Sequence, residues 1–244
     1  MRNRLRILLR IVKELIHRRD LQSLVLALTY RPFFQDPSQD PFHLQFQYFV
    51  QEINKRRGYR ILELGSRMSK VRGSFENYQE YIGFDIYAGE GVEVVGDIHK
   101  LSQYFPKERF DAVFSVSVFE HLAMPWKAVL EINKVMKEGG LLFIATHPAW
   151  PPHSLPWDFW RFPKGAFNIL LNTVTGFSIL KCEEGIPCTI FPFSNEANLK
   201  NYFKHTAYLG VSVVAEKTGE YDSRLSWNVE IEEMLDSMYP EKDR

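Results

Sequence analysis

The pattern of hydrophobic and polar residues predicts two helices ahead of the main domain. Apolar residues in segment 1–19 recur at helical spacing, with basic residues between them. A second apolar stripe over residues 46–53 has the i, i+3, i+4, i+7 spacing of a helix and follows a proline-rich loop that includes Pro41. Gly58 ends this stripe, because glycine readily adopts the left-handed conformation at a helix C-terminus. We therefore expect residues 1–57 to form an N-terminal helical appendage.

Short apolar runs after this appendage predict an α/β fold. The predicted strands are residues 60–64, 81–85, 92–97, 111–116 and 141–146. A helix between the last two strands begins at Pro125, since proline is favoured at the first helical position, and ends at Gly139 and Gly140. Strands separated by crossovers of this kind predict a Rossmann-like, mostly parallel sheet with helices on both faces.

The later part of the chain predicts a change of strand direction. Residues 177–180 and the alternating segment 207–216 have strand patterns, and no strong helix separates them. This arrangement predicts an antiparallel edge strand. The domain that contains the sheet then covers residues 58–218, and an apolar stripe within residues 219–244 predicts a C-terminal helix that packs on the domain.

The composition bears on location and on partners. The chain has 244 residues, of which 30 are basic and 30 acidic, so its zero net charge gives no field that would attract nucleic acid. Segment 1–19 is nevertheless basic and amphipathic, and it has two interpretations: docking on an anionic membrane surface, or packing of its apolar face on the domain. Arg10 interrupts any signal-peptide core, and no apolar stretch approaches the ~20 residues that span a bilayer. Because Cys182 and Cys188 are too few for a disulfide framework, we expect a cytoplasmic protein, with the inner membrane face as a peripheral location.

Polar residues follow each predicted strand and should meet at one crevice, because ligands of open parallel sheets bind beyond the carboxyl ends of the strands. Asp85 ends the second strand, where a carboxylate can accept both hydroxyl hydrogens of a ribose or, alternatively, cap the next segment. The turn Gly65-Ser66-Arg67 after the first strand fails the GxGxxG pattern, and no GxxxxGK[ST] motif is present. These features disfavour a dinucleotide and a P-loop, which leaves a nucleoside ligand without pyrophosphate.

The motifs at these strand ends resemble those of the class I S-adenosylmethionine-dependent methyltransferases, and within them the type 11 group. The similar segments are residues 61–65, 81–85, 96–101, 110–115 with 119–122, and 135–140. They cover about residues 59 to 147 in order and at normal spacing. The chain departs from the family at Ser66-Arg67-Met68, where further glycines are usual.

The resemblance implies S-adenosylmethionine as the cofactor and methyl transfer to a small-molecule or glycan-linked acceptor. It places Glu63, Gly65, Ser66 and Arg67 at the methionine end of the cofactor, Asp85 and Ile86 at the ribose, Asp97 and Ile98 at the adenine, and Ser115 and Val116 along the inner wall. Two alternative functions stay open. One is a nicotinamide-dependent oxidoreductase, which the missing phosphate glycines disfavour, and the other is a non-catalytic binding module at a membrane-associated assembly.

A proline-rich and tryptophan-rich segment follows the fifth strand. Five prolines between Pro148 and Pro163 predict a stiff, irregular loop over the crevice. The segment resembles one found in bacterial type 11 members associated with cell-surface polysaccharide pathways. Its candidate substrate-binding residues are Trp150, Trp157, Trp160 and Arg161, which can stack a ring and pair with an acidic group; alternatively, the aromatic residues attach the loop to the domain.

An alcohol acceptor would benefit from a general base with a pKa near neutral. The candidates are His121, His147 and His153, with Asp158 available to orient one of them, and each of these histidines has a purely structural alternative. The same His and Asp residues could form a metal site on paper, but no HxH or HExxH spacing supports one, so we expect no metal.

Overall fold

The computed structural model describes residues 37–190, 196, 199, 205–226 and 229–234. The chain divides into two compact units, residues 1–39 and 40–244, and the sheet lies in the second. The basic segment 1–19 lies outside the described residues, as does most of the apolar stripe near the C-terminus, so both interpretations of that segment stay predictions. Among the helices of the described residues, none is long and apolar enough to cross a membrane.

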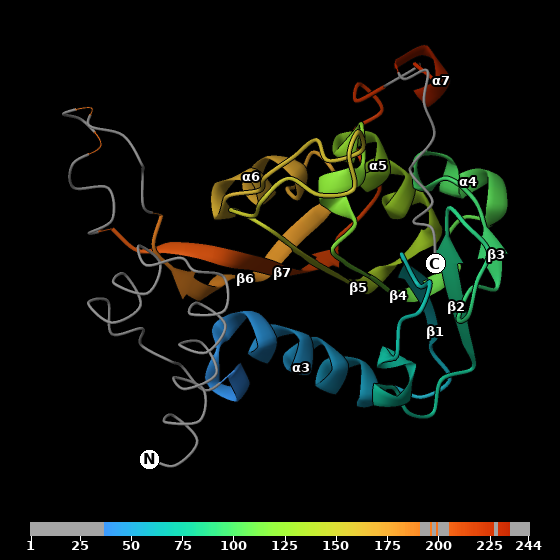
Figure 1. Cartoon of the computed structure of the whole chain (residues 1–244). Helices are drawn as coiled ribbons and strands as arrows, with labels where there is room; N and C mark the ends of the chain where they lie inside the picture. The colour runs from blue at the N-terminus through green and yellow to red at the C-terminus, as the bar shows by residue number, and fades with distance from the viewer. Residues whose placement is uncertain (1–36, 191–195, 197–198, 200–204, 227–228, 235–244) are drawn as a thin grey trace. The chain divides into compact units, whose positions relative to one another are not determined.

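A seven-stranded sheet forms the centre of the unit that spans residues 40–244. Its strands are β1 (Arg60–Leu64), β2 (Glu80–Asp85), β3 (Val94–Val95), β4 (Phe110–Val116), β5 (Met136–Thr146), β6 (Phe177–Cys188) and β7 (Ala207–Lys217), in the order β3-β2-β1-β4-β5-β7-β6 (Figure 1). β1 to β5 pair in parallel, whereas β7 pairs antiparallel with both β5 and β6. The predicted fold class, a mostly parallel sheet with an antiparallel edge, is confirmed.

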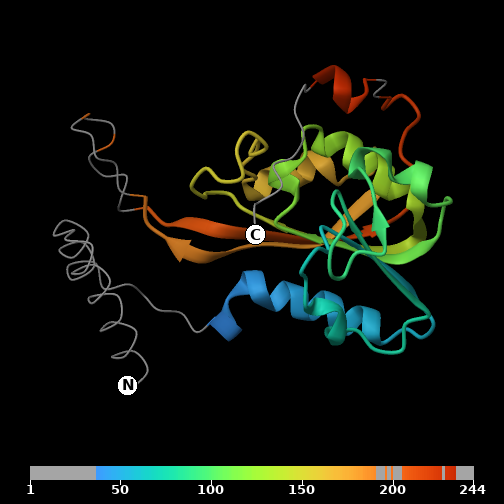
Figure 2. The same ribbon diagram turned by 45° about the vertical axis from the view of Figure 1, so that its right-hand side comes forward.

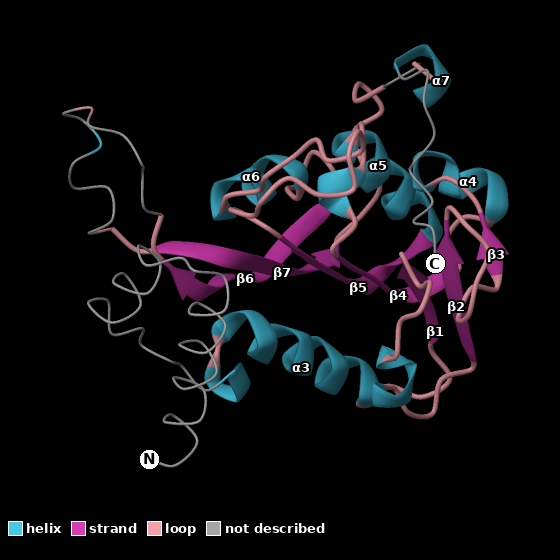
Figure 3. Ribbon diagram, in the orientation of Figure 1, coloured by secondary structure: helices cyan, strands magenta, loops and turns pink. Residues whose placement is uncertain are grey.

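Helices cover both faces of the sheet (Figures 2 and 3). The helices are α3 (Pro41–Asn54), α4 (Leu101–Tyr104), α5 (Pro125–Val135), α6 (Lys164–Leu170) and the short α7 (Ile231–Met234). α3 packs on one face, where Phe49 and Ile53 are fully buried against Phe114 and Phe143. On the other face α4, α5 and α6 contribute to a larger cluster with Leu62, and much of the aromatic content is therefore core.

Three predicted boundaries are wrong for local reasons. The predicted loop residue Pro41 is the first residue of α3, because the Asp40 side chain accepts a hydrogen bond from the Phe42 backbone N–H and caps the helix. α5 ends at Val135, and Gly139 and Gly140 lie within β5, where the register with β4 shifts.

The third wrong boundary is that of β3, which was predicted over residues 92–97 and contains only Val94 and Val95. The Glu93 carboxylate folds back and accepts a hydrogen bond from the Gly83 backbone N–H at 2.6 Å. This side chain occupies a donor of β2 that a longer β3 would use, so the parallel ladder begins at the pair Phe84 and Val94.

Candidate active site

A cleft opens at the carboxyl ends of β1, β2 and β4. Seven of the ten predicted cofactor residues line it: Gly65, Arg67, Asp85, Ile86, Asp97, Ile98 and Val116. His121 and Trp157, which were predicted as catalytic and substrate-binding, line the same cleft. The structure therefore brings seven cofactor candidates and two acceptor-side candidates to one cleft.

Gly65 lets the backbone pass close to the wall of this cleft. Its φ is +82°, which is in the left-handed region that favours glycine. A Cβ atom at this position would lie 2.2 Å from Cγ2 of Val118, so no side chain fits without a shift. Both features require glycine here, even though the following Ser66 and Arg67 depart from a glycine-rich loop.

Asp85 is fixed at the end of β2 by its neighbours' backbone. Its Oδ2 accepts a hydrogen bond from the Arg67 N–H at 3.2 Å, and its Oδ1 accepts one from the Tyr87 N–H at 3.1 Å. Each carboxylate oxygen can accept a second hydrogen bond, and the side chain lines the cleft. Asp85 thus holds the following turn and keeps acceptor capacity at the cleft, while its contact with a ribose stays a prediction.

Asp97 is held at another side of the cleft by His99. The Asp97 carboxylate accepts hydrogen bonds from the His99 backbone N–H at 2.9 Å and from Nδ1 at 2.7 Å. Burial alone would raise the pKa of Asp97, but these contacts with His99 outweigh it and lower the pKa. Nε2 of His99 accepts the Met124 N–H at 3.2 Å, which fixes the cleft wall to the segment before α5.

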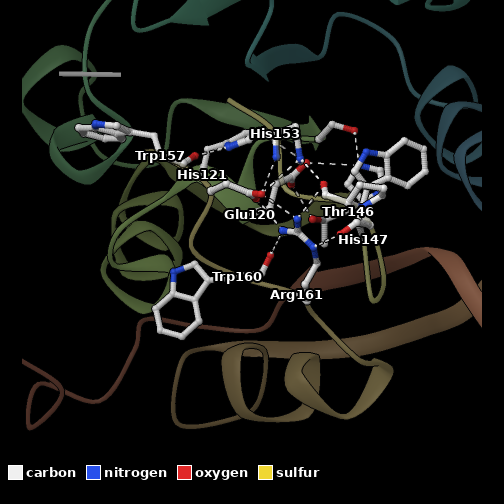
Figure 4. A network of polar contacts seen from close by, with 12 residues as sticks. Glu120, His121, Thr146, His147, His153, Trp157, Trp160 and Arg161 are labelled. Atoms are coloured by element: carbon white, nitrogen blue, oxygen red, sulfur yellow. Dashed lines mark hydrogen bonds and ion pairs between the residues drawn. The ribbon is translucent and has the colours of Figure 1, made fainter. Parts of the chain in front are cut away.

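A buried carboxylate and three imidazoles gather beyond β4 and β5 (Figure 4). Glu120 lies on the 3₁₀ turn Phe119–His121 and is fully buried. Its Oε2 accepts a hydrogen bond from the Thr146 hydroxyl at 2.6 Å. Nε2 of His147 lies 3.3 Å from Oε1, and Nε2 of His121 lies 3.9 Å from it. Burial lowers the pKa of His121, an effect that its contact with the Trp157 carbonyl opposes.

The Pro/Trp loop, residues 147–163 between β5 and α6, is closed by an ion pair. Arg161 and Asp158 bind through two parallel contacts of 2.6 and 2.8 Å, and this pairing lowers the pKa of Asp158 well below its usual range. Arg161 also donates to the backbone carbonyls of Trp150 and Trp160. The guanidinium is therefore engaged within the loop, where it maintains the loop's shape.

The three tryptophans of the Pro/Trp loop have different positions. Trp157 is 6% exposed and lines the cleft. Trp160 donates from Nε1 to the Leu122 carbonyl at 2.8 Å, which attaches the loop to the segment after β4. Trp150 stacks on the His147 imidazole with ring centroids 4.6 Å apart and an interplanar angle of 25°. Only Trp157 of these three is part of the cleft wall in the described structure.

Comparison with known proteins agrees with this geometry. Residues 63–144 match a family model described as a methyltransferase domain. Residues 63–144 therefore form part of a methyltransferase domain. No curated protein is similar enough to the methyltransferase to count as a match.

Solved structures share the fold of the methyltransferase at low sequence identity. A SAM-dependent methyltransferase from Archaeoglobus fulgidus is 17% identical, with a TM-score of 0.52 over 81% of this chain and 100% of its own. The trans-methyltransferase CalH, solved as a complex with SAH, is 16% identical, with a TM-score of 0.50 over 69% and 54%. The [4+2]-cyclase SpnF is also 16% identical, with a TM-score of 0.50 over 71% and 80%. These likenesses show the fold.

Several cleft residues of the methyltransferase were not predicted as site residues. They are Gly96, His99, Ser117, Val118 and Leu122 in the cleft wall, and Glu120 behind it. Most of them lie within or beside the motifs that carried the family resemblance. Whether each side chain faces the cleft depends on the turns after β3 and β4, whose conformation the motifs do not show. The notable signal in the sequence is the pair Glu120-His121 directly after a buried strand.

Three predicted cofactor residues of the methyltransferase lie outside the lining of the cleft. Ser66 and Ser115 are fully buried, and their hydroxyl groups have no hydrogen-bond partner among the described residues. Glu63 is 6% exposed and accepts a hydrogen bond from the Tyr81 hydroxyl at 2.6 Å. Burial raises the pKa of Glu63, and hydrogen bonds from Ser69 and Tyr81 partly offset that rise.

Tyr81→Phe should therefore destabilise the methyltransferase in a pH-dependent way. The variant removes the Tyr81 donor from the buried Glu63 carboxylate and leaves only the one from Ser69, which costs about 1–3 kcal/mol of the free energy of unfolding at pH 7. A raised folded pKa means that protonation of Glu63 favours folding below about pH 4.3, and that this contribution is lost as pH rises through the folded pKa. Loss of the hydroxyl raises the folded pKa further, so the destabilisation should be smaller at pH 4 than at pH 7.

Urea unfolding of wild type and Tyr81→Phe at both pH values measures this difference. Tyr78→Phe is the matched control, because Tyr78 is 38% exposed and its change should stay within about 0.5 kcal/mol. An equal loss for Tyr81→Phe at pH 4 and pH 7 would show that the hydroxyl does not act through the ionisation of Glu63.

Proposed function

We propose that the chain binds S-adenosylmethionine in the cleft and transfers its methyl group to a small-molecule or glycan-linked acceptor at the end of the cleft near His121 and Trp157. The observation that carries this proposal is the shared lining: Asp85 and Gly65 lie in the same cleft as His121 and Trp157. A cofactor and its acceptor must meet in one such space before the methyl group can move.

The residues present fit the cofactor. Asp85 retains hydrogen-bond acceptors for the ribose hydroxyls, and the left-handed Gly65 lets the backbone approach the methionine end near Arg67. Asp97 and Ile98 line the same cleft, and we assign them to the adenine, as the resemblance implies. When bound, the cofactor supplies a sulfonium that is already an activated methyl donor.

The chain's own residues then have three tasks: to hold the cofactor, to position the acceptor and to limit the access of water. We assign direct cofactor contacts to the seven predicted residues that line the cleft. We assign Glu63, Ser66 and Ser115 a supporting role, because they lie behind that lining. Methyl transfer gains its rate mainly from alignment of the acceptor atom with the methyl carbon, so a rigid wall serves catalysis directly.

The acceptor end is formed by side chains with both apolar and polar character. Trp157 offers a nearly buried aromatic face, and the imidazole of His121 lies on the same cleft wall. Trp150, Trp160 and Arg161 act on this end indirectly, through the shape of the Pro/Trp loop. This combination suits an acceptor that has an apolar ring face and a hydroxyl or amine.

Calorimetry with S-adenosylhomocysteine tests cofactor binding, and transfer of a labelled methyl group tests the reaction. We expect saturable one-to-one binding, no binding of NAD, and label incorporated into a compound from a panel of aromatic and sugar acceptors. Because the fold is shared with a cyclase, binding alone does not establish transfer. Lack of binding by the folded wild type would overturn the proposal.

A further inference from the structure

The imidazoles of His121, His147 and His153, which lie near Glu120, all use the same ring nitrogen to contact the backbone. Each presents Nδ1 to a carbonyl oxygen, and a carbonyl oxygen only accepts, so Nδ1 carries the proton in each ring. In the neutral ring the other nitrogen, Nε2, then carries a lone pair. The contacts are His121 Nδ1 with the Trp157 carbonyl, His147 Nδ1 with the Leu209 carbonyl at 3.1 Å, and His153 Nδ1 with the Pro151 carbonyl at 3.2 Å.

These imidazoles surround a carboxylate oxygen that lacks a donor. Glu120 is 0% exposed, and its Oε1 accepts no hydrogen bond from the described residues, although Oε2 is bound by Thr146. One ligand atom each from Glu120, His121 and His153 lie within 4.8 Å of one another. A buried anionic oxygen beside imidazole lone pairs is unfavourable unless a positive charge lies between them.

We propose that Glu120, His121 and His153 bind a divalent transition-metal ion of the Zn²⁺ type. A shared proton satisfies one pair of these atoms at a time, whereas a divalent ion satisfies all three. Two imidazoles and one carboxylate are a common ligand set for catalytic zinc and for related ions. Hydrogen bonds from Nδ1 to carbonyl oxygens are also how metal-binding histidines are usually oriented.

The geometry requires only a small closure. Ligand atoms about 2.1 Å from a tetrahedral ion lie about 3.4 Å apart. His121 Nε2 and Glu120 Oε1 are 3.9 Å apart, and all three ligand atoms fall within 4.8 Å, so shifts on the order of 1 Å bring them to bonding distance. The sequence predicted no metal site because His153 comes from the Pro/Trp loop, far along the chain from the adjacent pair Glu120-His121.

Three protein ligands leave a fourth position for water or substrate. His121 lines the cleft, so this position lies beside the proposed acceptor end. There the ion would polarise an acceptor hydroxyl and make its proton easier to remove. This role rests on the proposed methyl transfer, whereas metal binding itself does not.

Calorimetric titration of the untagged, chelator-treated full chain with Zn²⁺ tests the site. We expect one ion per chain, and weakening by at least about 10-fold in His153→Ala and in Glu120→Gln, since even the loss of an outer-shell partner costs that much. Co²⁺ should give an absorption spectrum of nitrogen and oxygen coordination in wild type that His153→Ala loses. His153 lies on the Pro/Trp loop and is partly exposed, so we expect His153→Ala to fold. The His153→Ala titration therefore tests the site even if Glu120→Gln does not fold.

Two matched controls identify the ligands. His43→Ala removes an exposed histidine on α3, and Cys182→Ser with Cys188→Ser removes both free thiols. Both control proteins should bind Zn²⁺ with the affinity of the wild type. Unchanged affinity in His153→Ala, or the absence of saturable Zn²⁺ binding by the folded wild type, would overturn the metal site. Binding of S-adenosylhomocysteine is measured separately, so failure of the metal site and failure of the proposed function give different results.

Discussion

Replacing Asp85 by alanine is expected to weaken binding of S-adenosylhomocysteine by about 100-fold, because two hydrogen bonds from ribose hydroxyls to a carboxylate, each worth about 1.5 kcal/mol, are lost. The carboxylate lines the cleft at the end of β2 and has acceptor capacity beyond its contacts with Arg67 and Tyr87. Asp85→Asn should lie between wild type and Asp85→Ala, since the amide keeps one acceptor oxygen. Calorimetry on the three proteins measures the series.

The same substitution also removes two backbone contacts, so binding must be separated from stability. The melting temperature of each variant reports the structural part, and a variant that melts near the wild-type temperature but binds weakly isolates the ribose contact. Asp222→Ala is the control, because Asp222 lies outside the cleft and pairs with an exposed Arg224. Equal affinity in wild type and Asp85→Ala would rule out the ribose assignment.

Gly65→Ala is expected to have the second large effect, on stability and on cofactor binding together. Alanine pays about 1–2 kcal/mol for a left-handed conformation such as φ +82°. Its Cβ would also lie 2.2 Å from Cγ2 of Val118, and overpacking of this kind costs about 1–3 kcal/mol. The free energy of unfolding should therefore fall by about 2–5 kcal/mol, and binding of S-adenosylhomocysteine should be lost or greatly weakened.

A second change separates the two costs. In Gly65→Ala with Val118→Ala both γ-methyl groups of Val118 are gone, so the overpacking should be relieved while the backbone cost stays. Gly73→Ala is the matched control, since no atom lies within 4 Å of its added Cβ and its φ is outside the left-handed region. Urea unfolding that finds Gly65→Ala as stable as Gly73→Ala would contradict the close approach at Gly65.

Much of the cofactor side of the cleft could be predicted from the sequence. Asp85 and Gly65 each follow a short apolar run, and the carboxyl ends of parallel strands necessarily meet at one edge of the sheet. That rule depends on how the strands pair and not on the side chains around them. It is the reason why seven of ten predicted cofactor residues line the cleft.

The sequence did not reveal where a side chain replaces a backbone partner or lies on the other face of the sheet. Glu93 occupies the Gly83 N–H and shortens β3, which no alternation of apolar residues reveals. Glu63 shares the α3 face of the sheet with Ile61, so it binds Tyr81 and lies outside the cleft lining. The Pro/Trp loop is similar, because Trp157 lines the cleft, Trp160 donates to the distant Leu122 carbonyl and Trp150 stacks on His147.

By itself, the sequence determined the succession of strands and crossovers along the chain and the fold class, because these depend on periodicity and on motifs that are local in the chain. Only the tertiary structure decided that Glu120, His121 and His153 converge, and that one buried oxygen of Glu120 has no donor among the described residues. Convergence of this kind depends on how a loop after β5 folds back over a turn after β4. Those contacts join residues far apart in sequence, so local patterns contain no record of them.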